Sequence, residues 1–267
     1  MEILHYGFFI RALSAGGFVA IACALLGVFL VLRQDAMIGH GLAHVAFAGV
    51  ALGLLLNQMP IAAALILSVI AGLLIMTIKS RAGIYGDTAI AIFSSTGFAV
   101  GILIVSLKGD FNVDLFGYLF GEILAISSAE VAMSVGLGLM VVAVTLIQYR
   151  RFMFMTFDRE AARVSGVPVQ RLETLLTVLT AVTVVLGMKV VGLIMVAALI
   201  VIPAAAGLQL ARNFRQALIS ASAVSLISVL GGLLMAFFLD WPASATIVLL
   251  AFLLFLAALP VGIHRRG

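Results

Sequence analysis

The sequence consists largely of long stretches that contain no Asp, Glu, Lys or Arg. A helix needs about 20 apolar residues to cross the hydrocarbon core of a membrane. The stretch 36–78 is long enough for two such helices, with a turn at 57–60. The uncharged stretches are 12–32, 36–78, 88–107, 131–149, 174–188, 190–211, 216–239 and 241–264.

These stretches predict an integral membrane protein. Only 10% of the residues are charged and 64% are hydrophobic, which leaves too little polar surface for a fold surrounded by water. A backbone in lipid must satisfy its own hydrogen bonds, and the long apolar runs lack the alternation of barrel strands. We therefore predict one all-α, polytopic domain over 1–267 with nine transmembrane helices, or eight if the short stretch 174–188 does not cross.

All but three of the 15 basic residues (Arg11, Lys108 and Lys189) fall into five clusters, and two predicted spans separate each cluster from the next. All five can therefore lie on the same side of the membrane. The positive-inside rule makes that side cytoplasmic, with the N-terminus outside and the C-terminus inside. Because the basic residues are spread along the chain in this way, they indicate topology rather than binding to nucleic acid. The clusters are Arg33; Lys79 and Arg81; Arg150 to Arg171; Arg212 and Arg215; and Arg265 and Arg266.

Acidic residues on the opposite, outer side have two interpretations. Asp114 and Glu122 lie among aromatic residues in the segment 108–130, which we expect to form a hairpin or re-entrant piece, and Asp240 lies in a later outer turn. They form either a cation-attracting mouth or ordinary solvated loop charge. A tight outer turn is also expected at 187–189.

Two histidines begin the second predicted span. His40 and His44 are four residues apart, so they share one face of a helix. Neutral imidazoles placed in this way can ligate Zn²⁺, and ionisable residues inside a membrane usually face a pathway or a partner. The alternative is a pair that only makes hydrogen bonds between helices. Zinc proteases with this spacing need Glu after the first His, and Gly41 stands there instead.

The longest polar interruption, 152–171, predicts a short helix outside the membrane near 156–168. Thr156 or Asp158 can cap its start, Gly166 can end it, and Pro168 restarts the chain. A membrane protein that exposes one compact charged helix to the cytoplasm usually meets a soluble partner there. The chain has no phosphate-binding loop, since none of its three lysines follows glycine. We therefore predict a non-enzymatic subunit, and any ATP must be bound by another protein.

Taken together, these segments resemble the permease subunits of ATP-binding-cassette (ABC) importers for zinc, manganese and related metals. Three stretches carry the resemblance, and the third is the most specific. They are GVFLVLRQDAMIGHGLAHVAFAGVALGLLL (27–56); DLFGYLFGEILAI (114–126); and TFDREAARVSGVPV (156–169) with KVVGLIMVAALIVIPAAAGLQLAR (189–212).

The resemblance implies the permease fold of the vitamin B12 and metal-chelate type, in the cytoplasmic membrane of a prokaryote. Two copies would pair around a central path in lipid, two ATPase subunits would dock on the coupling helices, and an extracytoplasmic metal-binding protein would deliver the ion. No cofactor would be bound permanently. The contact with the ATPase would be made by Phe157, Ala161 and Ala162 and tuned by charges at its rim. The coupling residues are Phe157, Asp158, Arg159, Glu160, Ala161, Ala162 and Gly166.

One departure from the family pattern favours zinc as the cargo. The family usually has Asp where this chain has His40, whereas His44 matches the pattern. Nitrogen ligands suit zinc and hard carboxylates suit manganese. Four other interpretations remain: manganese or iron, a metal chelate, a stand-alone secondary transporter or channel, and an intramembrane hydrolase, against which Gly41 argues.

Overall fold

The structure is a computed structural model, and it describes residues 7–57, 59–81, 86–108, 117–119, 121 and 127–264. Within these residues, nine helices are long and apolar enough to cross a membrane, so the prediction of an all-helical, polytopic protein is confirmed. The helices are α1 (Gly7–Leu32), α2 (Ile38–Leu55), α3 (Pro60–Arg81), α4 (Gly86–Lys108), α6 (Ser128–Ile147), α7 (Tyr149–Phe157), α8 (Arg159–Val164), α9 (Val169–Val191), α10 (Leu193–Leu210), α11 (Phe214–Leu239) and α12 (Ala243–His264).

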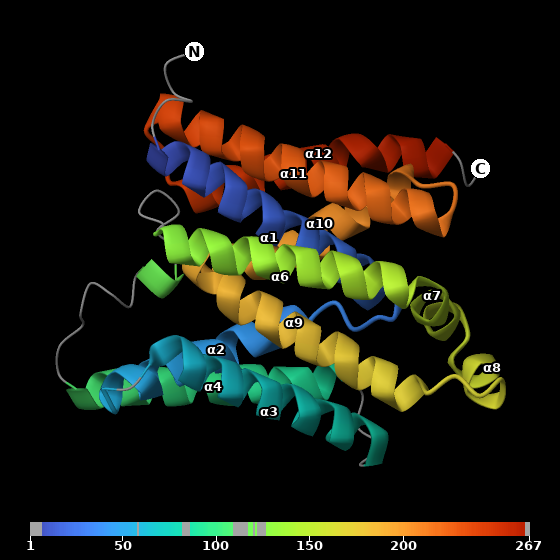
Figure 1. Cartoon of the computed structure of the whole chain (residues 1–267), viewed down its shortest axis with the longest axis horizontal. Helices are drawn as coiled ribbons and strands as arrows, with labels where there is room; N and C mark the ends of the chain where they lie inside the picture. The colour runs from blue at the N-terminus through green and yellow to red at the C-terminus, as the bar shows by residue number, and fades with distance from the viewer. Residues whose placement is uncertain are drawn as a thin grey trace.

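The long helices run side by side and form one elongated bundle (Figure 1). The short helices α7 and α8 lie at one end of it, together with the end of α12 and the connection between α10 and α11, whereas α1 and α6 begin at the opposite end. The ends of α1 and α3 carry Arg33 and Lys79, and both are tied to Asp35. The described basic clusters therefore share one end of the bundle, which we call the basic end.

Local sequence signals explain where several helices begin. Ser127 accepts a hydrogen bond from the backbone N–H of Glu130, and the Glu130 carboxylate accepts one from the backbone N–H of Ser127, which is a complete capping box for α6. Asn213 caps α11 by accepting from the backbone N–H of Gln216. These caps satisfy donors that the first turn of a helix leaves without partners.

Helix α1 is the most enclosed span, and it packs against α6, α9, α10 and α11. Glycine permits the closest of these approaches. A methyl group at Gly27 of α1 would lie 2.9 Å from the carbonyl carbon of Ile200 in α10, and closer still to its oxygen. At the same depth α2 touches α10, since a methyl group at Gly39 would lie 2.8 Å from Cδ1 of Ile200. Small residues let transmembrane helices pack at short range, so α1, α2 and α10 meet around Ile200.

The outer turn predicted at 187–189 is wrong. Those residues continue α9, which reaches Val191, and the chain turns back at Gly192. Gly192 has φ +92° and ψ +150°, a combination that only glycine adopts readily. The helix thus runs past the polar Lys189 to the residue that can make the turn. With 23 residues, α9 is also long enough to cross, so the predicted alternative of eight spans is not needed.

Candidate functional site

The short helix outside the bundle is α8, and its two ends are defined by specific hydrogen bonds. The carboxylate of Asp158 accepts from the backbone N–H of Ala161 at 2.8 Å. At the other end, Gly166 has φ +80°, the N–H of Gly166 donates to Arg163 and the N–H of Val167 donates to Ala162. This pair of bonds is the Schellman arrangement. The cap predicted at Asp158 and the stop predicted at Gly166 are therefore confirmed.

The surface of α8 differs from the surface expected from the sequence. Ala162 is fully buried, so it supports the helix from inside and offers no surface to a partner. Ala161 is half-buried. The apolar surface is formed instead by Phe157, the last residue of α7, which is 66% exposed, and by Val164 of α8, which is 87% exposed. The sequence did not indicate Val164 as a contact residue, because its neighbours are polar. An apolar side chain that is this exposed to solvent in a charged segment is a signal of a contact surface.

Aromatic side chains hold α7 and the exposed Phe157 against the bundle. The Phe157 ring meets the Phe214 ring at the start of α11 with centroids 5.7 Å apart. Phe214 also contacts Phe29 of α1 at 5.4 Å, and Phe29 contacts Phe152 of α7 at 5.3 Å. Each aromatic pair adds about 0.5–1.5 kcal/mol beyond the burial of its area. The segment that carries α8 is therefore anchored to two long helices.

Among the predicted surface charges of α8, Arg159 is turned toward its own chain. Its guanidinium contacts both carboxylate oxygens of Glu173 in α9, at 2.9 and 3.0 Å. Glu160 and Asp158 remain exposed. The fork of Arg159 fixes the orientation of α8 relative to α9, because a bidentate pair restricts both position and angle.

The two histidines of α2 meet as their spacing predicts. Nε2 of His44 lies 3.1 Å from Nε2 of His40. Two zinc–nitrogen bonds of about 2.0–2.1 Å at a tetrahedral angle place their nitrogens about 3.3 Å apart. The pair is thus close to the separation that one ion requires, and it equally allows a hydrogen bond between two neutral rings. Phe98 of α4 supports the His44 ring edge-on, with centroids 5.0 Å apart.

The neighbours of the pair on α2 face the middle of α10 and of α3. Gly39, next to His40, faces Ile200, which is seven residues after the start of α10 and ten before its end. Leu42 lies between the two histidines, and its Cδ2 would be 3.5 Å from a methyl group added at Gly72. Gly72 is 12 residues into α3 and nine from its end. On this chain alone His40 is exposed and His44 is half-buried.

The proposed outer mouth is only partly described by the structure. Asp114 and Glu122 lie outside the described residues. Asp240 is exposed and ends α11 in a left-handed conformation, so a helix-terminating role accounts for its position. Its role as a mouth residue stays a prediction.

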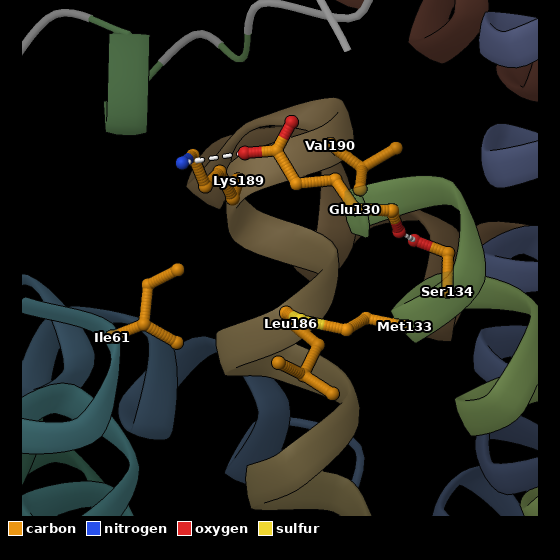
Figure 2. A pocket seen from close by; sticks show the side chains of 7 residues that line it. All are labelled: Ile61, Glu130, Met133, Ser134, Leu186, Lys189 and Val190. Carbon is orange, nitrogen blue, oxygen red and sulfur yellow. Dashed lines mark hydrogen bonds and ion pairs between the residues drawn. The ribbon is translucent and has the colours of Figure 1, made fainter. Parts of the chain in front are cut away.

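A second acid lies at the end of the bundle opposite the basic end, and the sequence analysis did not single it out. Glu130 of α6 pairs with Lys189 of α9, and Ser134 donates to the Glu130 carbonyl below it (Figure 2). The two charges flank a small hollow that Ile61, Met133, Leu186 and Val190 complete. Because Lys189 neutralises the Glu130 carboxylate, this hollow has little attraction for a cation.

Among the described residues, no group of three or more His, Cys, Asp or Glu side chains is placed to hold a metal ion. Within that described part of the chain, His40 and His44 therefore stand as a pair of imidazoles without a third ligand of these kinds.

The sequence places the chain in a family. A model of the ABC 3 transport family matches residues 5–262. The chain belongs to this family. It is 31% identical over 257 residues to the manganese transport system membrane protein MntC of Halalkalibacterium halodurans, covering 96% of this chain and 88% of the relative. It is 33% identical over 249 residues to the high-affinity zinc uptake system membrane protein ZnuB of Haemophilus influenzae, covering 93% and 95%.

Solved structures agree with this assignment. The fold matches a chain of PsaBC from Streptococcus pneumoniae in complex with Fab with a TM-score of 0.86 and 29% identity, over 96% of this chain and 92% of the other. It also matches the inward-facing conformation of a metal-chelate type ABC transporter with a TM-score of 0.73 at 16% identity, covering 97% and 87%. The second likeness concerns the fold alone. The predicted family and the predicted permease fold are both confirmed.

Proposed function

We propose that this protein is the transmembrane permease subunit of an ABC importer that moves divalent metal ions, with zinc as the preferred cargo, across the cytoplasmic membrane of a prokaryote. Membership of the ABC 3 transport family supports the class of transporter. Relatives of similar identity are named for manganese and for zinc, so the choice of metal depends on this chain's own residues.

The observation that carries the proposal is the convergence of two imidazole nitrogens 3.1 Å apart at the depth of Ile200. Polar groups in the middle of a membrane are expensive unless they face a partner or a water-filled path. His40 is exposed on the single chain. A second copy facing this surface would cover the pair and add two more imidazoles, giving four nitrogen ligands around one ion.

The surroundings of His44 favour brief rather than tight binding. Nδ1 of His44 is buried and has no hydrogen-bond partner within the described part of the chain. A histidine that holds a metal firmly usually donates its second ring N–H to a carboxylate or carbonyl, which makes it a better ligand. Without that support the ion is held weakly, and a transport site must release its cargo.

Nitrogen ligands also favour zinc over manganese. Imidazole suits zinc, whereas Mn²⁺ prefers carboxylate, carbonyl and water oxygens. His40 and His44 form an all-nitrogen pair, and the structure describes no carboxylate grouped with them.

Energy is proposed to enter at α8. Two ATPase subunits would dock on the exposed Phe157, Glu160 and Val164 of each copy, with the basic end of the bundle facing the cytoplasm. This orientation leaves the N-terminus outside and the C-terminus inside. An extracytoplasmic metal-binding protein would deliver the ion at the opposite end, where α6 begins.

The test is uptake into vesicles that contain the permease, its ATPase subunits and the metal-binding protein. We expect ATP-dependent uptake of zinc, with manganese slower, and a loss of at least about tenfold in the variant with both His40→Ala and His44→Ala. Assembly, followed by co-purification of the ATPase, should be unchanged. Equal uptake by the variant would refute the role of the pair. If only a chelated metal is transported, the cargo is a metal chelate and not the free ion. Zinc uptake without the ATPase would indicate a secondary transporter.

A further inference from the structure

Five side chains of alternating charge form a continuous row at the basic end of the bundle. The row begins at Lys79 on α3, which pairs with Asp35 in the link between α1 and α2. Asp35 faces Arg33 at 3.5 Å, and Arg33 donates to Glu173 of α9 at 2.7 Å. The carboxylate of Glu173 in turn pairs with the guanidinium group of Arg159 from α8. The row therefore joins α8 to the residues that immediately precede α2.

Glu173 is the centre of this row and is largely withdrawn from solvent. It is 8% exposed, and it serves two guanidinium groups with one carboxylate. The Arg33 side chain is 13% exposed, whereas that of Arg159 is 59% exposed. Replacing a buried ion pair by apolar groups often leaves stability unchanged or improved, while removing one partner is costly. A gain in stability is thus a weak reason for these ion pairs. The pairs do raise the free energy needed to move α8, α9 and the α1–α2 link relative to one another.

The link between α1 and α2 is short and held by its own backbone hydrogen bonds. The N–H of Asp35 donates to Leu30 at the end of α1, and the carbonyl of Asp35 accepts from Ile38, the first residue of α2. Gln34 takes a left-handed conformation at φ +59° to make this turn. A displacement of Arg33 or Asp35 is therefore transmitted to the first turn of α2, where His40 lies two residues after Ile38.

We propose that Arg33, Asp35 and Glu173 are positioning residues that carry a displacement of α8 to the start of α2 and so shift His40 and His44 between binding and release. The inference rests on the proposed function and adds to it the path between the docking helix and the histidine pair. The residues touch neither the cargo nor the ATPase. They act through the row of ion pairs and the stiff link.

The test compares the amount of zinc moved per ATP hydrolysed, in the complete reconstituted complex. The variant with both Arg33→Met and Glu173→Leu removes the central pair together, so it leaves no lone buried charge at that pair. We expect ATP hydrolysis to continue and zinc moved per ATP to fall about tenfold, the range of an ordinary coupling between sites. The matched control is Arg171→Met, on an exposed residue of the same end of α9 that makes no ion pair with the described residues, and we expect its ratio to equal that of the wild type.

Two further measurements separate the row from a merely structural role. Arg159→Met breaks the same row at its exposed end, so its effect on the ratio should not add to that of the Arg33→Met and Glu173→Leu pair; additive losses overturn the proposal. Glu173→Gln, which keeps the shape and loses the charge, should lower the ratio while the complex still assembles. An unchanged ratio in Glu173→Gln overturns the proposal even where the double variant fails to fold. A wild-type complex that hydrolyses ATP and moves no metal refutes the proposed function instead.

Discussion

The tight meeting of α1 and α10 makes Gly27→Ala a sharp test of the packing around the histidine pair. The added methyl group would lie 2.9 Å from the carbonyl carbon of Ile200 and 3.1 Å from Cβ of Ala204. The carbonyl oxygen lies closer still, belongs to helix backbone and cannot rotate away, so the two helices must separate by more than about 1 Å to restore ordinary contact.

The expected cost follows from two opposing effects. Overpacking of this kind destabilises by about 3 kcal/mol at the upper end of its usual range. Alanine recovers up to about 1 kcal/mol through its higher helix propensity. The net loss is about 2 kcal/mol, which lowers the melting temperature of a chain of this size by about 4–8 °C.

The assay is thermal unfolding of the purified protein in detergent, with Gly136→Ala as the matched control. No atom lies within 4 Å of the position that a methyl group would take at Gly136. We expect this control to be at least as stable as the wild type. A Gly27→Ala protein that melts at the same temperature as the wild type would contradict the close approach of α1 and α10.

Three other predictions concern single residues. His44→Ala should reduce zinc uptake more than tenfold without lowering the melting temperature by more than a few degrees, because His44 is only half-buried, and uptake assays check this. Asp158→Ala should remove the cap on Ala161 and destabilise α8 by about 1 kcal/mol, which amide hydrogen exchange at Ala161 would detect. Gly192→Ala should destabilise the α9–α10 turn by about 1–3 kcal/mol because of its φ of +92°, measured as a lower melting temperature.

Each of these has an outcome that would count against it. Uptake that survives in His44→Ala would leave the pair with a structural role. Asp158→Asn keeps an oxygen acceptor and should retain the cap, so equal exchange rates in the Ala and Asn variants would exclude a capping role. A Gly192→Ala protein of wild-type stability would show that the turn does not need the conformation described.

The spans could be predicted from sequence because lipid imposes a simple demand on composition. Uncharged stretches of sufficient length mark the helices, and the turn at 57–60 divides the longest stretch as expected. The prediction failed at 187–189, where a lysine was taken as the end of a helix. Charge marks the end of a span less reliably than backbone conformation, and Gly192 is the residue able to make the turn.

The ends of α8 could also be predicted from sequence, since a cap at Asp158 and a stop at Gly166 are local signals. Which residues of α8 are exposed could not be predicted, because burial of Ala162 depends on helices distant in sequence. For the same reason, sequence alone could not assign Glu173: its two partners, Arg33 and Arg159, come from separate elements. The histidine pair was predicted by spacing, but its depth follows only from the contacts of its neighbours with Ile200 and Gly72.

Zinc accumulation in sealed vesicles that contain the permease with and without its ATPase subunits shows whether ATP hydrolysis drives transport through this bundle. We predict accumulation only when the ATPase subunits, ATP and the metal-binding protein are all present. Accumulation at the same rate without ATPase subunits would contradict the claim that energy enters this bundle through α8.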